Sequence, residues 1–345
     1  MNSDSLLPTT RNCWRTALAL LLLFYLCIPS TRAQTQDDDE LVRVNTNLIQ
    51  LNVGVADTKG NVVLNLSRND FTVYEDGVRQ EIVSFEPAQS PFSLVLLLDA
   101  SGSTLSFRPT LKQSALRFID ALSPEDRVAV VVFNDKVKLL QDFTTDRRKI
   151  AYAIQDVDGH GGTDFYDALK FALQQLGREG KRRKAIITLT DGVDTQMRKQ
   201  DATAAAQAQT DEEAIASVKP EQSASLRAAL DLADRQGVTV YPLALPSGDP
   251  RRFASITPQQ AAIYHSARTR MQALANRTGG RLHEINRLED MGRLYAEVAA
   301  DMRTLYTIAY QSPGTRPRDG SWRAITIEVA RPELLARTRP GYYAR

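Results

Sequence analysis

The sequence predicts an α/β fold, with a doubly wound and mostly parallel sheet, plus a small β-sandwich-like domain formed from both chain ends. Three observations support this prediction. Continuous apolar runs alternate with helical patterns over about 210 residues in the middle of the chain. Strand-like segments precede this region and return after it. The chain has 345 residues, of which 43% are hydrophobic, so it can bury the cores of two domains.

The first 33 residues are typical of a secretory signal peptide. Arg11 and Arg15 precede an apolar run over 16–28, and Thr31-Arg32-Ala33 offers small residues at the −3 and −1 positions of a cleavage site. The run is about 13 residues long, whereas a helix that spans a bilayer needs about 20. We therefore expect cleavage after Ala33, with export to the periplasm or secretion and no stable membrane anchor. Retention of the segment as an anchor stays open.

Both cysteines, Cys13 and Cys27, lie in this predicted signal, so the mature chain would contain none. This excludes thiol catalysis and cysteine-ligated zinc. Tyr25 and Leu26 are too bulky for a lipoprotein signal at Cys27. The first 33 residues hold three of the 43 basic and one of the 41 acidic residues, so the mature chain has equal numbers of both. This balance gives no reason to expect nucleic acid as a partner.

The segment from 34 to 91 begins with a short acidic leader and then shows β patterns. A strand-like run over 42–55 is followed by a second strand at 71–74, and Glu75-Asp76-Gly77 predicts a hairpin turn after it. We expect residues 80–86 to pair with 71–74.

From 92 to 304, buried strands alternate with amphipathic helices, as in a parallel sheet that is covered on both faces. The predicted strands are 93–98, 128–133, 137–143 (a hairpin partner or edge), 185–189, 238–244 and 281–285. The predicted helices are about 108–121, 147–156, 164–176, 222–236, 266–277 and 288–303. Residues 195–221 show the weakest periodicity and exceed the usual length of a loop between elements.

Strand patterns return at 305–310 and 322–329. The N-terminal strands alone would have little to bury, and the C-terminal strands alone would have unpaired edges. We therefore expect 34–91 and 305–345 to form one β-domain, into which an α/β domain of residues 92–304 is inserted.

Oxygen-bearing side chains follow the predicted strands of the α/β domain. Asp99, Ser101 and Ser103 form a D-x-S-x-S loop directly after the first buried strand, Thr163 lies in Gly-Gly-Thr-Asp, and Asp191 lies in Thr-Asp-Gly after a later buried strand. In open α/β sheets, ligands bind at the carboxyl ends of the strands. Oxygen ligands suit hard cations such as Mg²⁺.

These three segments, in this order, resemble the metal-ion-dependent adhesion site (MIDAS) of von Willebrand factor A-type (VWA) domains, which have a Rossmann-like fold. The resemblance covers roughly 92–304, and no position of the motif is missing. It implies that Mg²⁺ (or Ca²⁺ or Mn²⁺) is held, in part through water, and that a protein ligand presents a carboxylate to it. The implied metal ligands are Asp99, Ser101, Ser103, Thr163 and Asp191.

Each motif also has a plain structural interpretation. Ser101 and Ser103 could satisfy a turn, Asp99 could cap a helix, Thr163 could be the N-cap of the helix at 164–176, and Asp191 could belong to a turn only. A metal-free structural scaffold therefore stays as an alternative.

A second alternative is a metal-dependent phosphoester hydrolase. A strand that ends in Asp also begins the phosphatases of haloacid-dehalogenase type, but their chemistry needs a second acid two residues on, where this chain has Ser101. His160, His265 and His283 fall in no metal-binding spacing. We therefore expect a binding module rather than an enzyme.

The flanks of the α/β domain carry a further resemblance. Residues 70–77 and 339–343 resemble segments of exported VWA-related proteins that are frequent in Acidobacteria-like bacteria. This resemblance supports the architecture and export. The combined hypothesis is an exported, metal-dependent adhesion or interaction module, with segments 195–221 and 246–265 on its metal face. The sequence does not decide whether these segments determine specificity, and it does not give the oligomeric state.

Overall fold

The computed structural model describes residues 48–180, 182–248, 255–312 and 319–344. Within it, Thr46–Arg345 form one compact unit. The predicted signal peptide, its cleavage site and the acidic leader lie outside the described residues. In the described part of the chain, no helix has both the length and the apolar character needed to cross a membrane.

The centre of the α/β region is a six-stranded sheet with the order β10-β9-β8-β5-β6-β7. All neighbours pair in parallel except β6 and β7, which are antiparallel and leave β7 at the edge. The predicted doubly wound, mostly parallel sheet is therefore confirmed. Its strands are β5 (Phe92–Asp99), β6 (Arg127–Phe133), β7 (Val137–Thr144), β8 (Arg183–Thr190), β9 (Val238–Ala244) and β10 (His283–Glu284).

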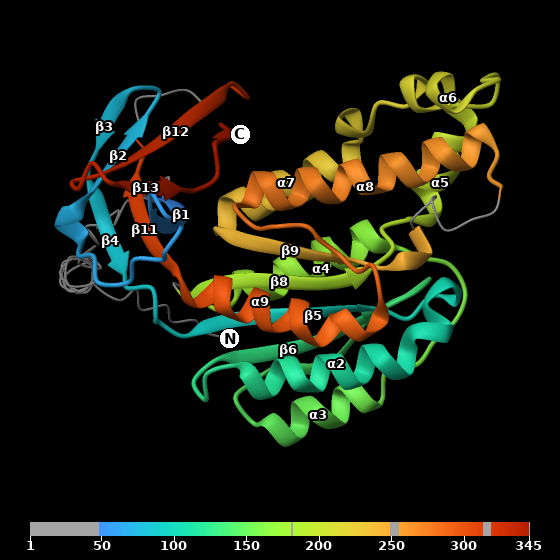
Figure 1. The fold of residues 1–345 in the computed structure, drawn as a ribbon, viewed down its shortest axis with the longest axis horizontal. Coiled ribbons are helices and arrows are strands. Elements are labelled where there is room, and N and C mark those ends of the chain that lie inside the picture. Colours follow the sequence, from blue (N-terminus) through green and yellow to red (C-terminus); the bar gives the residue numbers. More distant parts are fainter. Residues whose placement is uncertain (1–47, 181, 249–254, 313–318, 345) are drawn as a thin grey trace, which may run out of the picture. The chain divides into compact units, whose positions relative to one another are not determined.

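Helices cover both faces of this sheet (Figure 1). Every residue of β5 is buried, because its side chains alternate between two cores. Leu94, Leu96 and Leu98 face a core shared with α2, α3 and α9, whereas Val95 and Leu97 face a core shared with α4, α7 and the end of α8. The helices are α2 (Arg108–Ala121), α3 (Arg147–Gln155), α4 (Phe165–Gly177), α5 (Thr195–Ala204), α6 (Asp211–Ser217), α7 (Ala224–Gln236), α8 (Pro258–Thr278) and α9 (Met291–Arg303).

The β-domain consists of two four-stranded sheets, with the orders β13-β1-β11-β4 and β14-β12-β2-β3. Each sheet combines strands from both ends of the chain, so the predicted β-sandwich-like part is confirmed (Figure 1). Apolar side chains from both sheets, among them Val53, Val73 and Ile308, share one core. The strands are β1 (Leu48–Asp57), β2 (Phe71–Glu75), β3 (Val78–Gln80), β4 (Ile82–Glu86), β11 (Leu305–Gln311), β12 (Trp322–Val329), β13 (Leu334–Arg337) and β14 (Gly341–Tyr343).

The prediction of one strand at 80–86 that pairs with 71–74 was wrong in part. Only β3 pairs with β2, whereas β4 pairs with β11 in the other sheet. Gln80 of β3 and Ile82 of β4 are both buried, and Glu81 between them is exposed. The alternation of buried and exposed side chains therefore continues from a strand of one sheet into a strand of the other.

Two segments that we expected to be long loops contain helices. Residues 195–221 form α5, α6 and a 3-10 turn (η3, Pro220–Gln222), because Asp194 and Thr210 cap the two helices. Helix α8 begins at Pro258 rather than near 266, because Thr257 and Gln260 form a capping box around its first turn.

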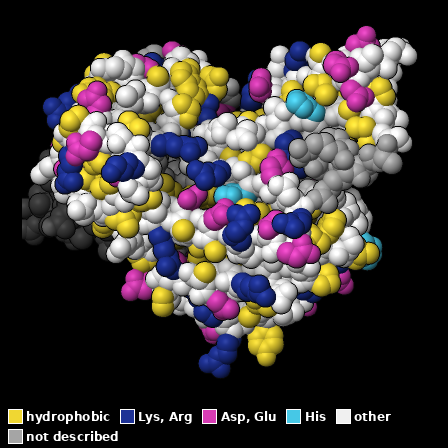
Figure 2. All heavy atoms as spheres, viewed as in Figure 1, with side chains coloured by type: hydrophobic (Ala, Val, Ile, Leu, Met, Phe, Trp, Pro, Cys, Tyr) yellow, Lys and Arg dark blue, Asp and Glu magenta, His cyan; other side chains and the backbone are white. Residues whose placement is uncertain are grey.

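The β-domain contacts the α/β region near the end of the sheet where β9 begins. Asp234, at the end of α7, is buried and pairs with Arg277 at 2.6 Å and with Arg339 at 2.8 Å. Arg277 also lies 4.3 Å from the ring centre of Trp322 in β12. Ion pairs and a cation–π contact therefore connect α7 and α8 to the C-terminal strands. On the face seen in Figure 2, basic and acidic side chains are interspersed.

Candidate metal centre

The two predicted aspartates lie at the carboxyl ends of neighbouring strands. Asp99 is the last residue of β5, and Asp191 directly follows β8, which pairs with β5. Asp99 is fully buried. Its burial and the nearby charge of Asp191 raise the pKa of Asp99 to about 7. The sheet therefore brings two carboxylates into electrostatic contact at one end.

The D-x-S-x-S segment forms a tight loop around Asp99. The backbone N–H of Ser101 donates to Asp99 Oδ1 at 2.9 Å, and the hydroxyl of Thr104 donates to the Asp99 carbonyl at 3.0 Å. The Ser101 and Ser103 hydroxyl oxygens lie 3.1 Å apart. The buried side chain of Arg108 donates to the Ala100 carbonyl at 3.1 Å and so connects the start of α2 to the loop. Thr104 and Arg108 thus satisfy carbonyl groups of the loop, whereas the two serine hydroxyls bond to each other and the Ser101 side chain also bonds to Asp99.

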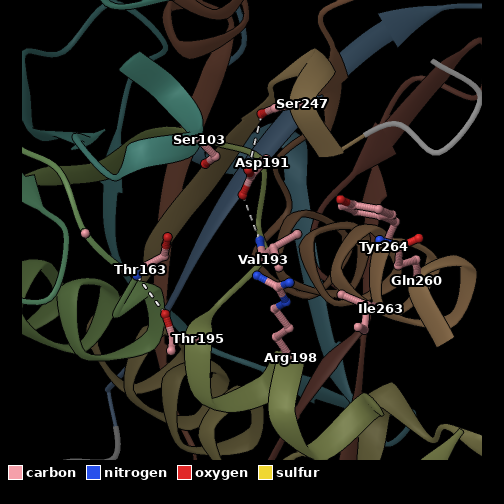
Figure 3. A pocket seen from close by; sticks show the side chains of 12 residues that line it. Ser103, Thr163, Asp191, Val193, Thr195, Arg198, Ser247, Gln260, Ile263 and Tyr264 are labelled. Carbon is pink, nitrogen blue, oxygen red and sulfur yellow. Dashed lines mark hydrogen bonds between the residues drawn. The ribbon is translucent and has the colours of Figure 1, made fainter. Parts of the chain in front are cut away.

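Thr163 is held by its main chain. Its N–H donates to Thr195 Oγ1 at 2.8 Å, and the N–H of Thr195 donates to the Thr163 carbonyl at 2.8 Å. The N-cap of α4 is Asp164, so the interpretation of Thr163 as that cap was wrong. The preceding Gly161 has φ 102°, and a Cβ there would lie 2.1 Å from the Asp135 carboxylate, so the turn needs glycine. The Thr163 hydroxyl points into a cavity (Figure 3).

This cavity has a volume of about 230 Å³. Three predicted residues, Ser103, Thr163 and Asp191, line it. Asp99 and Ser101 are buried and do not line it, but Ser101 contacts Ser103 at its wall. The remaining lining residues are Gly161, Gly162, Val193, Thr195, Arg198, Ser247, Gln260, Ile263 and Tyr264.

Sequence reasoning missed two hydroxyl side chains that bind the aspartates. Thr190 Oγ1 donates to Asp99 Oδ2 at 2.6 Å, and Ser247 Oγ donates to Asp191 Oδ2 at 3.2 Å. Thr190 stands in the same Thr-Asp-Gly motif as Asp191, and Ser247 follows the carboxyl end of β9. The rule that ligand-binding residues follow parallel strands could have identified Ser247.

In the described part of the chain, no basic side chain forms an ion pair with Asp99 or Asp191. The described residues also contain no group of three or more His, Cys, Asp or Glu side chains that could hold a metal ion. The predicted set differs from such a group, since it combines two carboxylates with three hydroxyls. These five oxygens are a donor set that suits a hard divalent cation.

Part of the chain is similar in sequence to known proteins. Residues 94–193 match the family model of the von Willebrand factor type A domain. An uncharacterized protein of Synechocystis sp. is 36% identical over 107 residues, which cover 30% of this chain and 25% of that protein. The human voltage-dependent calcium channel subunit alpha-2/delta-2 is 29% identical over 127 residues, which cover 33% of this chain and 11% of that subunit.

Among solved structures, a von Willebrand factor type A protein from Catenulispora acidiphila aligns with a TM-score of 0.46 at 14% identity, over 88% of this chain and 64% of that one. The chain spans only a quarter or less of the length of the two curated relatives. The matched segment, 94–193, contains β5 to β8 and carries all five predicted ligands. This segment of the chain is therefore similar to von Willebrand factor type A domains.

Proposed function

We propose that this chain is an exported protein-binding module that depends on a divalent cation and catalyses no reaction. One observation carries the proposal: two carboxylates lie in electrostatic contact, with hydroxyl groups and no basic side chain of the described residues as their partners. A cation would relieve the repulsion between them and keep both ionised. The residues that would hold Mg²⁺, or else Ca²⁺ or Mn²⁺, directly or through water, are Asp99, Ser101, Ser103, Thr163 and Asp191.

The partner would present a carboxylate to the cation. Hard cations prefer carboxylate oxygen, and the five protein oxygens leave room for a ligand from outside. Ser103, Thr163 and Asp191 line a cavity, so a side chain of a partner can reach the ion there. A protein partner also agrees with the name of the human relative, which is a subunit of a larger channel.

Metal binding tests the proposal directly. Mg²⁺ at about 100 times its dissociation constant should stabilise the folded protein by about 2.7 kcal/mol, measured as a shift in chemical unfolding. Asp99→Ala should abolish the shift. Asp167→Asn is the matched control, since Asp167 is an exposed carboxylate in the first turn of α4 that does not line the cavity. An Asp99→Ala protein with an unchanged response to Mg²⁺ would contradict the site.

Partner capture tests the rest of the proposal. In pull-downs from the cell envelope, a chelator and Asp191→Ala should each abolish capture, whereas Asp167→Asn should retain it. Capture that survives chelation would place the partner surface elsewhere. Export predicts that the mature protein begins at Gln34, which N-terminal sequencing can check.

A further inference from the structure

We propose that Arg198 is the second anchor for the partner: the cation takes one oxygen of an acidic side chain and the Arg198 guanidinium takes the other. This inference rests on the proposed function, and it names a specificity residue outside the five metal ligands. It also fixes the ligand class as a carboxylate on a short methylene stem, supplied by a glutamate or aspartate of another protein.

Arg198 lines the same cavity as the metal-site residues. It lies in the first turns of α5, and Figure 3 shows its guanidinium directed toward the side of the cavity that holds Val193 and Asp191. Ser103 and Thr163 contribute their hydroxyls to the same space. A carboxylate in this cavity can therefore reach the proposed cation and the guanidinium at the same time.

The Arg198 side chain has no ion pair or hydrogen bond with any other described residue. Two other arginines of the α/β region have partners. Arg270 of α8 forms a two-pronged pair with Asp201, at 2.6 and 2.7 Å, and Arg108 pairs with Asp158 at 2.7 Å. A guanidinium presents its N–H groups in a fork that matches a carboxylate. Arg198 thus presents to the cavity a guanidinium that has no hydrogen-bond acceptor among the described residues.

The helix that carries Arg198 is fixed in place. Asp194 caps α5 by accepting the N–H groups of Gln196 and Met197, at 2.9 and 3.0 Å. One turn beyond Arg198, the Asp201–Arg270 pair is buried and connects α5 to α8. The spacing between Arg198 and the α8 wall of the cavity is therefore set before a ligand arrives, which lowers the entropy lost on binding.

The size and lining of the cavity favour a single side chain. Its volume of about 230 Å³ is below the range of about 300–1,000 Å³ that is typical for larger ligands. Ile263 and Tyr264 of α8 form an apolar part of the wall, where methylene groups can pack. A divalent cation balances Asp99 and Asp191, so the charge of Arg198 makes the loaded site attractive to an anion.

A blocked peptide, acetyl-Gly-Glu-Gly-amide, is a suitable probe because the glutamate side chain is its only carboxylate. Its binding to the full chain loaded with Mn²⁺ can be followed by paramagnetic broadening of the glutamate protons, and Mn²⁺ binding can be measured separately by electron paramagnetic resonance. The variants are Arg198→Gln, Arg198→Lys and Lys199→Gln. Lys199 is the matched control, since it is exposed on the same helix but does not line the cavity.

We expect Arg198→Gln to weaken peptide binding by at least about tenfold, because a charged hydrogen bond is lost. Its Mn²⁺ affinity should stay within about twofold of the original. Arg198→Lys should restore part of the peptide affinity, since it keeps the charge but not the fork, and Lys199→Gln should leave it unchanged. The peptide with glutamine in place of glutamate should not bind, and acetate should bind more weakly than the glutamate peptide.

Three results would overturn the inference: Arg198→Gln that binds the peptide as tightly as the original protein, Mn²⁺-loaded protein that does not bind the peptide, or acetate that binds as tightly as the peptide. Each of them leaves the metal site standing. If the unaltered protein binds no Mn²⁺, the proposed function itself fails, and the separate metal measurement distinguishes the two cases.

Discussion

Buried carboxylates at the two ends of the central sheet have partners of opposite charge character. Near the end where β9 begins, Asp234 is enclosed by the guanidinium groups of Arg277 and Arg339. At the carboxyl ends of β5 and β8, Asp99 faces a second carboxylate, Asp191, and its side chain receives N–H and O–H donors only from uncharged groups.

We propose that the difference separates a structural role from a binding role. At Asp234 the protein supplies its own positive charge, and the result is a fixed contact between the β-domain and α7. At Asp99 the folded chain tolerates a repulsion that lowers its own stability, and such groups concentrate at functional sites. The following predictions test this contrast.

The largest effect should come from removing the strands that the β-domain takes from the C-terminus. Deletion of residues 305–345 removes β11, which lies between β1 and β4, and β12, which lies beside β2. The N-terminal strands should then unfold, because β1 and β4 lose the strands they pair with, β2 keeps only β3, and the shared core loses its C-terminal side chains. Hydrogen exchange of 48–86 measures this. Protection of these residues that matches the full chain would contradict the shared domain.

The next largest effect should come from Asp234, the buried carboxylate at the contact between the β-domain and α7. Asp234→Asn leaves Arg277 and Arg339 largely buried without a counter-ion and should destabilise the fold by about 3–5 kcal/mol in urea unfolding. Asp231→Asn, a change three residues earlier in the same helix, is a suitable comparison. If Asp234→Asn were no more harmful than Asp231→Asn, the junction would not depend on the ion pairs.

A smaller effect should appear as a pH dependence of the metal-free protein. Burial and the nearby Asp191 raise the pKa of Asp99 to about 7 in the folded state, above the ordinary value of 3.8 for an aspartate. Between these values the unfolded chain releases the proton and the folded chain keeps it, so this group lowers stability as pH rises from about 4 to about 7. Above that range its destabilising contribution stays constant.

The difference in unfolding free energy between the original protein and Asp99→Asn, measured in chelator from pH 4 to 8, isolates this contribution. Saturating Mg²⁺ should remove this loss of stability with rising pH, because a cation favours the ionised carboxylate. A difference that does not change with pH would mean that Asp99 carries no repulsion to relieve.

The smallest effect concerns the hydroxyl that orients Asp99. Thr190→Val removes the donor to Asp99 Oδ2 and should weaken Mg²⁺ affinity by about tenfold. Thr188→Val is the matched control in the same strand, since the Thr188 hydroxyl is buried and has no hydrogen-bond partner. Thr188→Val should leave Mg²⁺ affinity unchanged and keep or raise stability. Equal Mg²⁺ affinities in the two variants would exclude an orienting role for Thr190.

The sequence was sufficient to predict the central sheet because its strands are continuous apolar runs. The run at 93–98 is buried on both faces and ends in Asp99, so both the strand and the position of its terminal carboxylate could be predicted. The start of α8 could also have been predicted, since Thr257, Pro258 and Gln260 form a recognisable cap.

Other features could not be predicted because they depend on which elements become neighbours. The alternation of Gln80, Glu81 and Ile82 continues without a break, so periodicity cannot reveal that β3 and β4 belong to different sheets. Arg198 and Ser247 are 49 positions apart and meet at one cavity only through the packing of α5 and the end of β9. The proposed metal ligands lie in short local motifs and were easier to predict than a cavity wall that is assembled from separate segments.

The position of β11 has a consequence for biosynthesis. Asn52 of β1 bonds to Thr307 of β11 across 255 positions of the chain. Both strands that pair with β1, β11 and β13, are made more than 240 residues later, so β1 lacks its neighbours in the sheet until then. Contacts of such sequence separation slow folding. During synthesis β1 would present open edges, to which other nascent chains can add. A truncated chain that lacks the C-terminal strands therefore cannot complete the β-domain, and its N-terminal strands stay exposed.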